Sequence, residues 1–186
     1  AMKEHGVKKN IIMGETNNLP YSTRLTGPGQ VGIYARIYHQ FSAAFPAKET
    51  EKIVEILRRV FPSNAIISAE NVLETILRVS LRHPLMVIFN LVRIELGKQF
   101  PFYIEGLSPS SKRVGEVVDR EAMTVMQALG IKPRPHPLLD PDLPRDPEGE
   151  VNAKRKKAAY ELWKAPSTVQ ERFMTEDVPY AWVTIA

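Results

Sequence analysis

The sequence contains no cysteine, which excludes disulfide bonds, thiolate nucleophiles and cysteine-ligated metal sites. It has no apolar run of the roughly 18 residues that a membrane-spanning helix requires, because the best stretch, residues 85–96, is short and carries Arg93 and Glu95. A large excess of one charge is also missing: 25 Lys and Arg stand against 21 Asp and Glu, a net charge of +4. We therefore expect a cytoplasmic protein with no membrane or nucleic-acid partner, and a weak preference for small anions.

The chain does contain enough apolar material for one ordinary domain, since 44% of its 186 residues are hydrophobic. Short apolar runs at residues 10–14 and 31–41 predict strands, and the next apolar stretch predicts a helix. From Ile66 onward the pattern is helical. We therefore predict a mainly α protein, with a short β–β–α remnant of a larger sheet over residues 1–62 and an all-helical domain over residues 63–186.

Terminal signals predict where the helices of the second part begin and end. Pro84 suits a first helical turn and Gly97 suits a C-terminal cap, so one buried helix is expected between them. Ser108 predicts the start of the next helix, which Gly130 ends. Closely spaced prolines predict an extended loop over residues 132–150.

One glycine-rich stretch, GPGQVG at residues 27–32, matches the dinucleotide-binding fingerprint letter for letter. That motif must follow a buried strand and open a helix whose N-terminus faces the pyrophosphate. Here the preceding residues 21–26 are polar, and the following residues alternate as in a strand. We therefore interpret the stretch as a turn between two strands, and the cofactor-binding residues stay unknown.

His83 is the first candidate for proton chemistry. It immediately precedes Pro84 at an expected helix start, where the helix dipole disfavours the charged imidazolium. A neutral imidazole can take up or release a proton near neutral pH, as the reduction of a carbonyl or imine requires. Asn90 follows two turns later on the same face and is a candidate partner for a substrate oxygen. From residue type alone, a histidine that caps the helix or belongs to the core is the more common case.

Arg172 and Asp177 lie five residues apart, across an expected helix end. An arginine can grip a carboxylate with two parallel hydrogen bonds, so Arg172 is a candidate substrate-binding residue. Asp177 is a candidate for holding the His83 ring and stabilising its charged form. Without further context, an exposed ion pair of little energetic consequence is the more common arrangement, and a pairing of Arg172 with Asp177 stays open.

A basic run from Lys154 to Lys157 lies beside aromatic residues on a helix predicted over about residues 151–163. It suggests nucleic-acid binding, but the interspersed alanine and glutamate are typical of an amphipathic helix with a solvated face. His39 and His136 show no metal-ligand spacing, and no metal site is predicted.

Further short motifs follow one another along the chain. They are Glu15 to Tyr21 with Arg24, Gly27-Pro28-Gly29, Glu70 to Glu74, His83-Pro84 with Asn90, Phe102 to Ser110, Asp119-Arg120-Glu121, and Arg172 to Tyr180. In this order they resemble the opine dehydrogenases, the octopine/nopaline dehydrogenase group. The resemblance covers about residue 10 to the C-terminus, interrupted by the proline-rich loop.

The resemblance implies a Rossmann domain followed by an all-helical domain, with the active site between them. It implies an NAD- or NADP-dependent oxidoreductase that acts on CH–NH bonds and reduces the imine formed from a 2-oxo acid and the amino group of an amino acid. By position, His83 matches the family's catalytic histidine and Asp177 its acidic partner. Arg172 matches the arginine that orients the substrate carboxylate.

The family's glycine fingerprint and first strands have no counterpart in this sequence. Residues 1–62 would then be the C-terminal remnant of the nucleotide-binding domain, and residues 63–186 the substrate and catalytic domain. We expect a truncated chain that is inactive alone and that forms a homodimer or associates with a separate Rossmann fragment. A non-catalytic helical interaction domain or a gene remnant is the alternative, and nucleic-acid binding through the basic helix is a more distant one.

Overall fold

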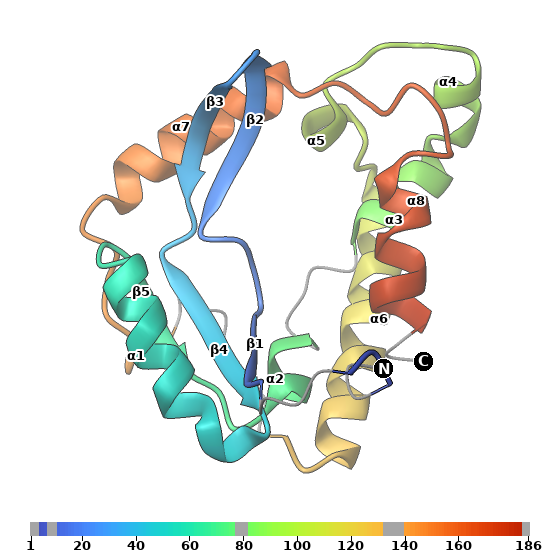
Figure 1. Cartoon of the computed structure of the whole chain (residues 1–186). Helices are drawn as coiled ribbons and strands as arrows, with labels where there is room; N and C mark the ends of the chain where they lie inside the picture. Colours follow the sequence, from blue (N-terminus) through green and yellow to red (C-terminus); the bar gives the residue numbers. More distant parts are fainter. Residues whose placement is uncertain (1–3, 7–10, 77–81, 132–139, 184–186) are drawn as a thin grey trace.

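The computed structural model describes residues 4–6, 11–76, 82–131 and 140–183. Its elements are, in chain order, β1 (Met13–Thr16), β2 (Tyr21–Gly27), β3 (Gln30–Arg36), β4 (His39–Phe45), η1 (Ala47–Glu49), α1 (Thr50–Val60), β5 (Ala65–Ser68), α2 (Val72–Ile76), α3 (Arg82–Phe89), α4 (Leu91–Glu95), α5 (Phe102–Glu105), α6 (Pro109–Ala128), α7 (Gly149–Leu162), α8 (Arg172–Thr175) and η2 (Val178–Trp182). Figure 1 shows the strands with α1 and α7 on one side of the molecule, and α3, α6 and α8 packed together on the other. The prediction of a small β-containing start followed by a mainly helical part is confirmed.

The three-stranded sheet has the order β1-β4-β5. β4 is central: it pairs antiparallel with β1, where Met13 faces Phe45, and parallel with β5, where His39 faces Ala65. Parallel strands need a crossover connection, and α1 provides it between β4 and β5. Residues 40–44 of β4 are buried because strands flank them and helices cover them.

The prediction that the chain is helical from Ile66 onward is wrong for its first residues. Ile66 lies in β5, is buried, and accepts a hydrogen bond on its carbonyl oxygen from the Arg58 guanidinium of α1 at 3.0 Å. A short apolar run fits a strand or a helix equally well, and here the parallel pairing with β4 decides in favour of the strand.

β2 and β3 form a separate two-stranded antiparallel sheet. Pro28 and Gly29 make its turn, and the φ of +67° at Gly29 is a conformation that favours glycine. The interpretation of residues 27–32 as a turn between strands is therefore confirmed. The single strand predicted over residues 31–41 is two strands, because the chain leaves the hairpin at residues 37–38 and enters the larger sheet as β4.

α6 begins and ends as predicted. Ser108 caps it: its Oγ accepts a hydrogen bond from the Ser111 N–H at 3.1 Å, and its own N–H donates to Ser111 Oγ at 2.9 Å. Gly130, with a φ of +73°, follows its C-terminal end.

The single buried helix predicted between Pro84 and Gly97 is wrong in two respects. It is interrupted at Asn90, between α3 and α4, where the Asn90 side chain bonds to main-chain carbonyls. It is also only partly covered, and its exposed apolar side chains are Ile88, Phe89, Leu91, Val92 and Leu96. Gly97, with a φ of +67°, ends α4 as predicted.

The larger of the core clusters joins α3, α5 and α8. Its buried members are Met86, Val87, Ile94, Phe100, Phe102 and Ala165, and the half-buried Tyr103 and Phe173 pack against it. A smaller cluster around Phe41 and Ala43 lies at the three-stranded sheet. No helix within the described ranges is long and apolar enough to cross a membrane.

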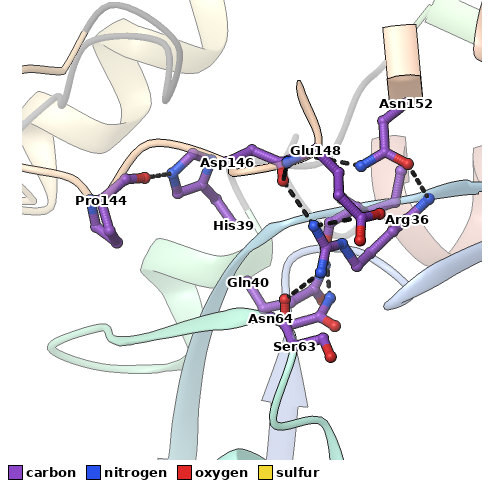
Figure 2. A network of polar contacts seen from close by, with 10 residues as sticks. Arg36, His39, Gln40, Ser63, Asn64, Pro144, Asp146, Glu148 and Asn152 are labelled. Atoms are coloured by element: carbon purple, nitrogen blue, oxygen red, sulfur yellow. Dashed lines mark hydrogen bonds and ion pairs between the residues drawn. The ribbon is translucent and has the colours of Figure 1, made fainter. Parts of the chain in front are cut away.

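A polar network ties the segment before α7 to the strands (Figure 2). Arg36, at the end of β3, donates from Nη2 to Asp146 Oδ1 at 2.7 Å, and Asn152 donates from Nδ2 to Asp146 Oδ2 at 2.9 Å. The His39 ring donates from Nε2 to the carbonyl oxygen of Pro144 at 2.8 Å. These bonds hold the segment that leads into α7 against the β3–β4 junction.

Candidate active site

The structure brings two of the predicted site residues into direct contact. His83 lies in the first turn of α3, and Asp177 lies between α8 and η2. The Nδ1 atom of His83 is 2.8 Å from Oδ2 of Asp177. His83 and Asp177 are far apart in the sequence. The packing of α3 against α8 in the larger core cluster brings the two side chains together.

The bonding pattern assigns the tautomer of the His83 ring. An ionised carboxylate only accepts hydrogen bonds, so Nδ1 carries the hydrogen that faces Asp177. In the neutral ring, Nε2 then keeps its lone pair and can take up a proton. A histidine held by a carboxylate in this way is a proton acceptor whose charged form the carboxylate stabilises.

The other ring nitrogen also has a partner, Tyr103 of α5. The Tyr103 hydroxyl oxygen lies 3.2 Å from Nε2 of His83. Asp177, His83 and Tyr103 therefore form one hydrogen-bonded chain that joins the segment after α8 to α3 and α5. Nothing in the local sequence distinguishes Tyr103 from other aromatic residues, and it entered the sequence analysis only as part of the stretch from Phe102 to Ser110.

Aromatic rings pack around this hydrogen-bonded chain. The ring centroids of His83 and Phe173 are 4.7 Å apart. The Tyr103 ring stacks on Tyr160 of α7, with centroids 4.7 Å apart and an interplanar angle of 14°. It also meets Trp163 edge-on at 5.6 Å. The site is thus built by α3, α5, α7 and α8 together.

Burial raises the pKa of the Tyr103 phenol above its ordinary value. The charges of Arg24 and Arg172 act in the opposite direction, whereas Tyr160 and Asp177 add to the rise. Two guanidiniums are therefore close enough to the phenol to affect its ionisation. The phenol stays protonated at neutral pH and can donate a hydrogen bond.

Arg172, in the first turn of α8, is exposed. Among the described residues its guanidinium makes no ion pair, and it does not pair with Asp177, which bonds to His83 instead. Its Cζ atom lies 5.9 Å from the ring centroid of Phe173, which itself contacts His83. The charge of Arg172 thus remains available beside the His83–Asp177 pair.

Asn90 uses its side chain for the fold. Its Nδ2 atom donates to the carbonyl oxygens of Met86 at 2.8 Å and Gly106 at 2.9 Å, and its Oδ1 accepts from Arg93 at 3.3 Å. Asn90 is buried, and these bonds join the end of α3 to the end of α5. A substrate role for Asn90 stays a prediction that these contacts do not support.

The glycine-rich stretch at residues 27–32 does not fit a dinucleotide. It forms the turn of the β2–β3 hairpin and continues into the strand β3, whereas a dinucleotide fingerprint opens a helix whose N-terminus faces the pyrophosphate. In the part of the chain that the structure describes, no three His, Asp or Glu side chains gather as possible metal ligands. His136 lies outside the described residues.

Comparisons with known proteins agree with the resemblance seen in the sequence. Residues 68–186 match the family model described as "NAD/NADP octopine/nopaline dehydrogenase, alpha-helical domain". An opine dehydrogenase from Arthrobacter sp. (strain 1C) is 28% identical over 188 residues, an alignment that covers 100% of this chain and 52% of that relative. The chain therefore spans about half the length of the curated relative it matches. Because the family model covers more than half of the sequence, the chain belongs to the octopine/nopaline dehydrogenase family.

Proposed function

We propose that this chain supplies the proton-transfer and carboxylate-binding residues of an opine dehydrogenase, an oxidoreductase that condenses a 2-oxo acid reductively with an amino acid. The observation that carries the proposal is the bond of 2.8 Å between His83 Nδ1 and Asp177 Oδ2, together with the nearby guanidinium of Arg172, which forms no ion pair with any described residue. The family match and the likeness to the Arthrobacter opine dehydrogenase support the reaction class.

The chemistry that these residues can perform is proton transfer at the condensation step. When an amine attacks the keto carbon, Nε2 of His83 takes the proton that the amine nitrogen loses. That proton returns to the alkoxide oxygen and gives the carbinolamine. Transfer of the second nitrogen proton through Nε2 to the hydroxyl then lets the hydroxyl leave as water and gives the imine. Asp177 stabilises the imidazolium between these events, and Arg172 binds the carboxylate of the 2-oxo acid with charge-assisted hydrogen bonds.

The family description names NAD or NADP, and reduction of the imine requires a hydride that no side chain can give. Because residues 27–32 do not fit the dinucleotide, we propose that a separate nucleotide-binding part must hold the cofactor. This chain alone should then be inactive, and residues 1–62 should belong structurally to that nucleotide-binding part.

Titration of the purified chain with NADH and NADPH tests this division. We expect that the chain alone binds neither cofactor tightly. We also expect oxidation of NADH or NADPH once a separately expressed Rossmann fragment of the family is added with a 2-oxo acid and an amino acid. Tight binding of either cofactor by the chain alone would contradict it.

The exposed apolar side chains of α3 and α4 favour one alternative, a non-catalytic interaction domain. Nuclear magnetic resonance titration of the chain with a 2-oxo acid such as pyruvate separates the two. The proposed enzyme requires shifts of the His83 and Arg172 side-chain signals, whereas the interaction domain predicts none at either residue.

A further inference from the structure

We infer that Tyr103 is a positioning residue for the proposed proton transfer: its hydroxyl holds the Nε2 side of the His83 ring in both protonation states of that ring. The inference rests on the proposed function as far as the reaction is concerned. The hydrogen bond on which it depends is a property of the folded chain itself.

Both nitrogens of the His83 ring have protein partners. Asp177 lies 2.8 Å from Nδ1, and the Tyr103 hydroxyl lies 3.2 Å from Nε2. The partners come from segments on either side of the ring, so rotation of the imidazole would break a bond at each end. A general base benefits from this arrangement, because its proton-accepting nitrogen keeps one direction.

A hydroxyl is suited to the Nε2 side because it can both donate and accept. While the ring is neutral, the Tyr103 O–H donates to the lone pair of Nε2. Before Nε2 takes up a proton, the phenolic hydrogen turns to another acceptor and frees the lone pair. The new N–H then donates to the Tyr103 oxygen. Asp177 accepts from Nδ1 throughout, so the ring need not move between the two states.

The phenol is held in place from α7, independently of the helix that carries His83. Its ring stacks on Tyr160 at 4.7 Å and meets Trp163 edge-on at 5.6 Å. Trp163 in turn lies under the Arg24 guanidinium of β2, whose Cζ atom is 4.3 Å from the ring centroid. The position of the hydroxyl thus depends on packing between α5, α7 and the hairpin.

Burial keeps the phenol protonated at neutral pH, against the charges of the nearby arginines. Burial raises the pKa of Tyr103; Arg24 on β2 and Arg172 on α8 lower it, and Tyr160 on α7 and Asp177 raise it further. The rise prevails, so the phenol remains a donor at neutral pH. A phenolate at this place would accept only and would lose the bond to the neutral ring.

The test compares Tyr103→Phe with Tyr160→Phe in the full chain labelled with 15N at its four histidines. The phenylalanine keeps the aromatic stack in both variants, and only the first removes the hydroxyl that faces His83. The variant His83→Gln assigns the His83 signals. We expect Tyr103→Phe to move the His83 Nε2 signal toward that of a lone-pair nitrogen without a hydrogen bond. Tyr160→Phe should leave it in place. Coincident Nε2 signals in wild type and Tyr103→Phe would overturn the inference.

A second measurement asks whether the bond matters for the reaction, with the Rossmann fragment present to supply cofactor. Tyr103→Phe should lower kcat by about tenfold, change KM little and alter the pH profile of kcat, as expected for loss of one hydrogen bond at the base. An unchanged kcat and pH profile would refute the positioning role. If the wild-type chain itself shows no turnover, the proposed function fails, and the nitrogen signals still decide whether Tyr103 positions His83.

Discussion

Nδ1 of His83 lies 2.8 Å from Oδ2 of Asp177, although the two residues are 94 positions apart in the sequence. The fold creates this contact by packing the short helix α8 against α3. The exposed fractions of the two side chains are 29% and 25%, so water still reaches both. An accessible pair of this kind contributes little to stability and remains open to a substrate.

Replacement of Asp177 by Asn should leave the free energy of unfolding within about 1 kcal/mol of the wild-type value, because the pair is partly exposed. Urea denaturation followed by circular dichroism measures this. A loss of several kcal/mol would show that Asp177 serves the fold, and the proposed role beside His83 would lose its basis.

Replacement of Arg172 by Met should reduce kcat/KM for the 2-oxo acid by about ten- to a hundredfold in the complemented enzyme, since a charge-assisted hydrogen bond contributes about 1.5–3 kcal/mol. The loss should fall mainly on KM. Arg172→Lys is the control, because it keeps the charge but loses the bidentate geometry. Its kcat/KM should lie between those of the wild type and Arg172→Met. Unaltered kinetics in Arg172→Met would assign the carboxylate to another residue.

Replacement of Arg36 by Met should destabilise the protein by about 3–5 kcal/mol, because it leaves the nearly buried carboxylate of Asp146 without its cation. Arg82→Met provides a matched control. The Arg82–Asp119 pair has the same N–O distance of 2.7 Å, but its side chains are 47% and 44% exposed. The control should cost less than about 1 kcal/mol. Equal losses in the two variants would show that burial of the Arg36 network does not determine its strength.

Asp146 should make stability depend on pH in the acid range. Burial alone would raise the pKa of Asp146, but hydrogen bonds from the Glu148 N–H and Asn152, together with the charge of Arg36, outweigh it and lower the pKa below 3.8. The resulting stabilisation is present above the unfolded-state pKa and is lost as the pH falls through the lower folded-state pKa. Compared with wild type, Asp146→Asn should show a flatter decline of unfolding free energy below about pH 4. Parallel curves would exclude this carboxylate as a source of acid sensitivity.

The chain should self-associate through the exposed apolar side chains of the β2–β3 hairpin. Leu25, Val31 and Ile33 of the hairpin are 82%, 58% and 61% exposed, and Leu25 faces Val31 across the strands. Light scattering should therefore give a dimer at high concentration. The double change Leu25→Glu and Ile33→Glu should dissociate the dimer, whereas Leu129→Glu, an exposed leucine at the end of α6, should not. A wild-type monomer at every concentration would contradict this expectation.

Local signals in the sequence predicted those features that depend on a few neighbouring residues. The turn at Pro28 and Gly29 and the cap at Ser108 are examples, because backbone conformation and capping are decided within a few positions. The strand at Ile66 and the break at Asn90 depend on partners elsewhere in the fold, namely β4 and the end of α5. No periodicity in the sequence encodes those partners.

The same distinction between local signals and contacts made by the fold applies to the candidate site. His83, Asp177 and Arg172 were identified by their resemblance to family motifs, since spacing alone left ordinary ion pairs and core histidines open. Tyr103 could not be identified, because its importance arises only when α5 and α3 pack together and bring its hydroxyl to Nε2 of His83. Contacts across helices of this kind become visible only in the folded chain.

Turnover by the chain after addition of a separately expressed Rossmann fragment tests the proposed function most directly. Oxidation of NADH or NADPH is measured as a function of both a 2-oxo acid and an amino acid. We predict oxidation that requires both substrates and that falls by about 10²–10⁴ in His83→Gln. Full activity in His83→Gln, or no oxidation when the added fragment is folded and binds cofactor, would contradict the account.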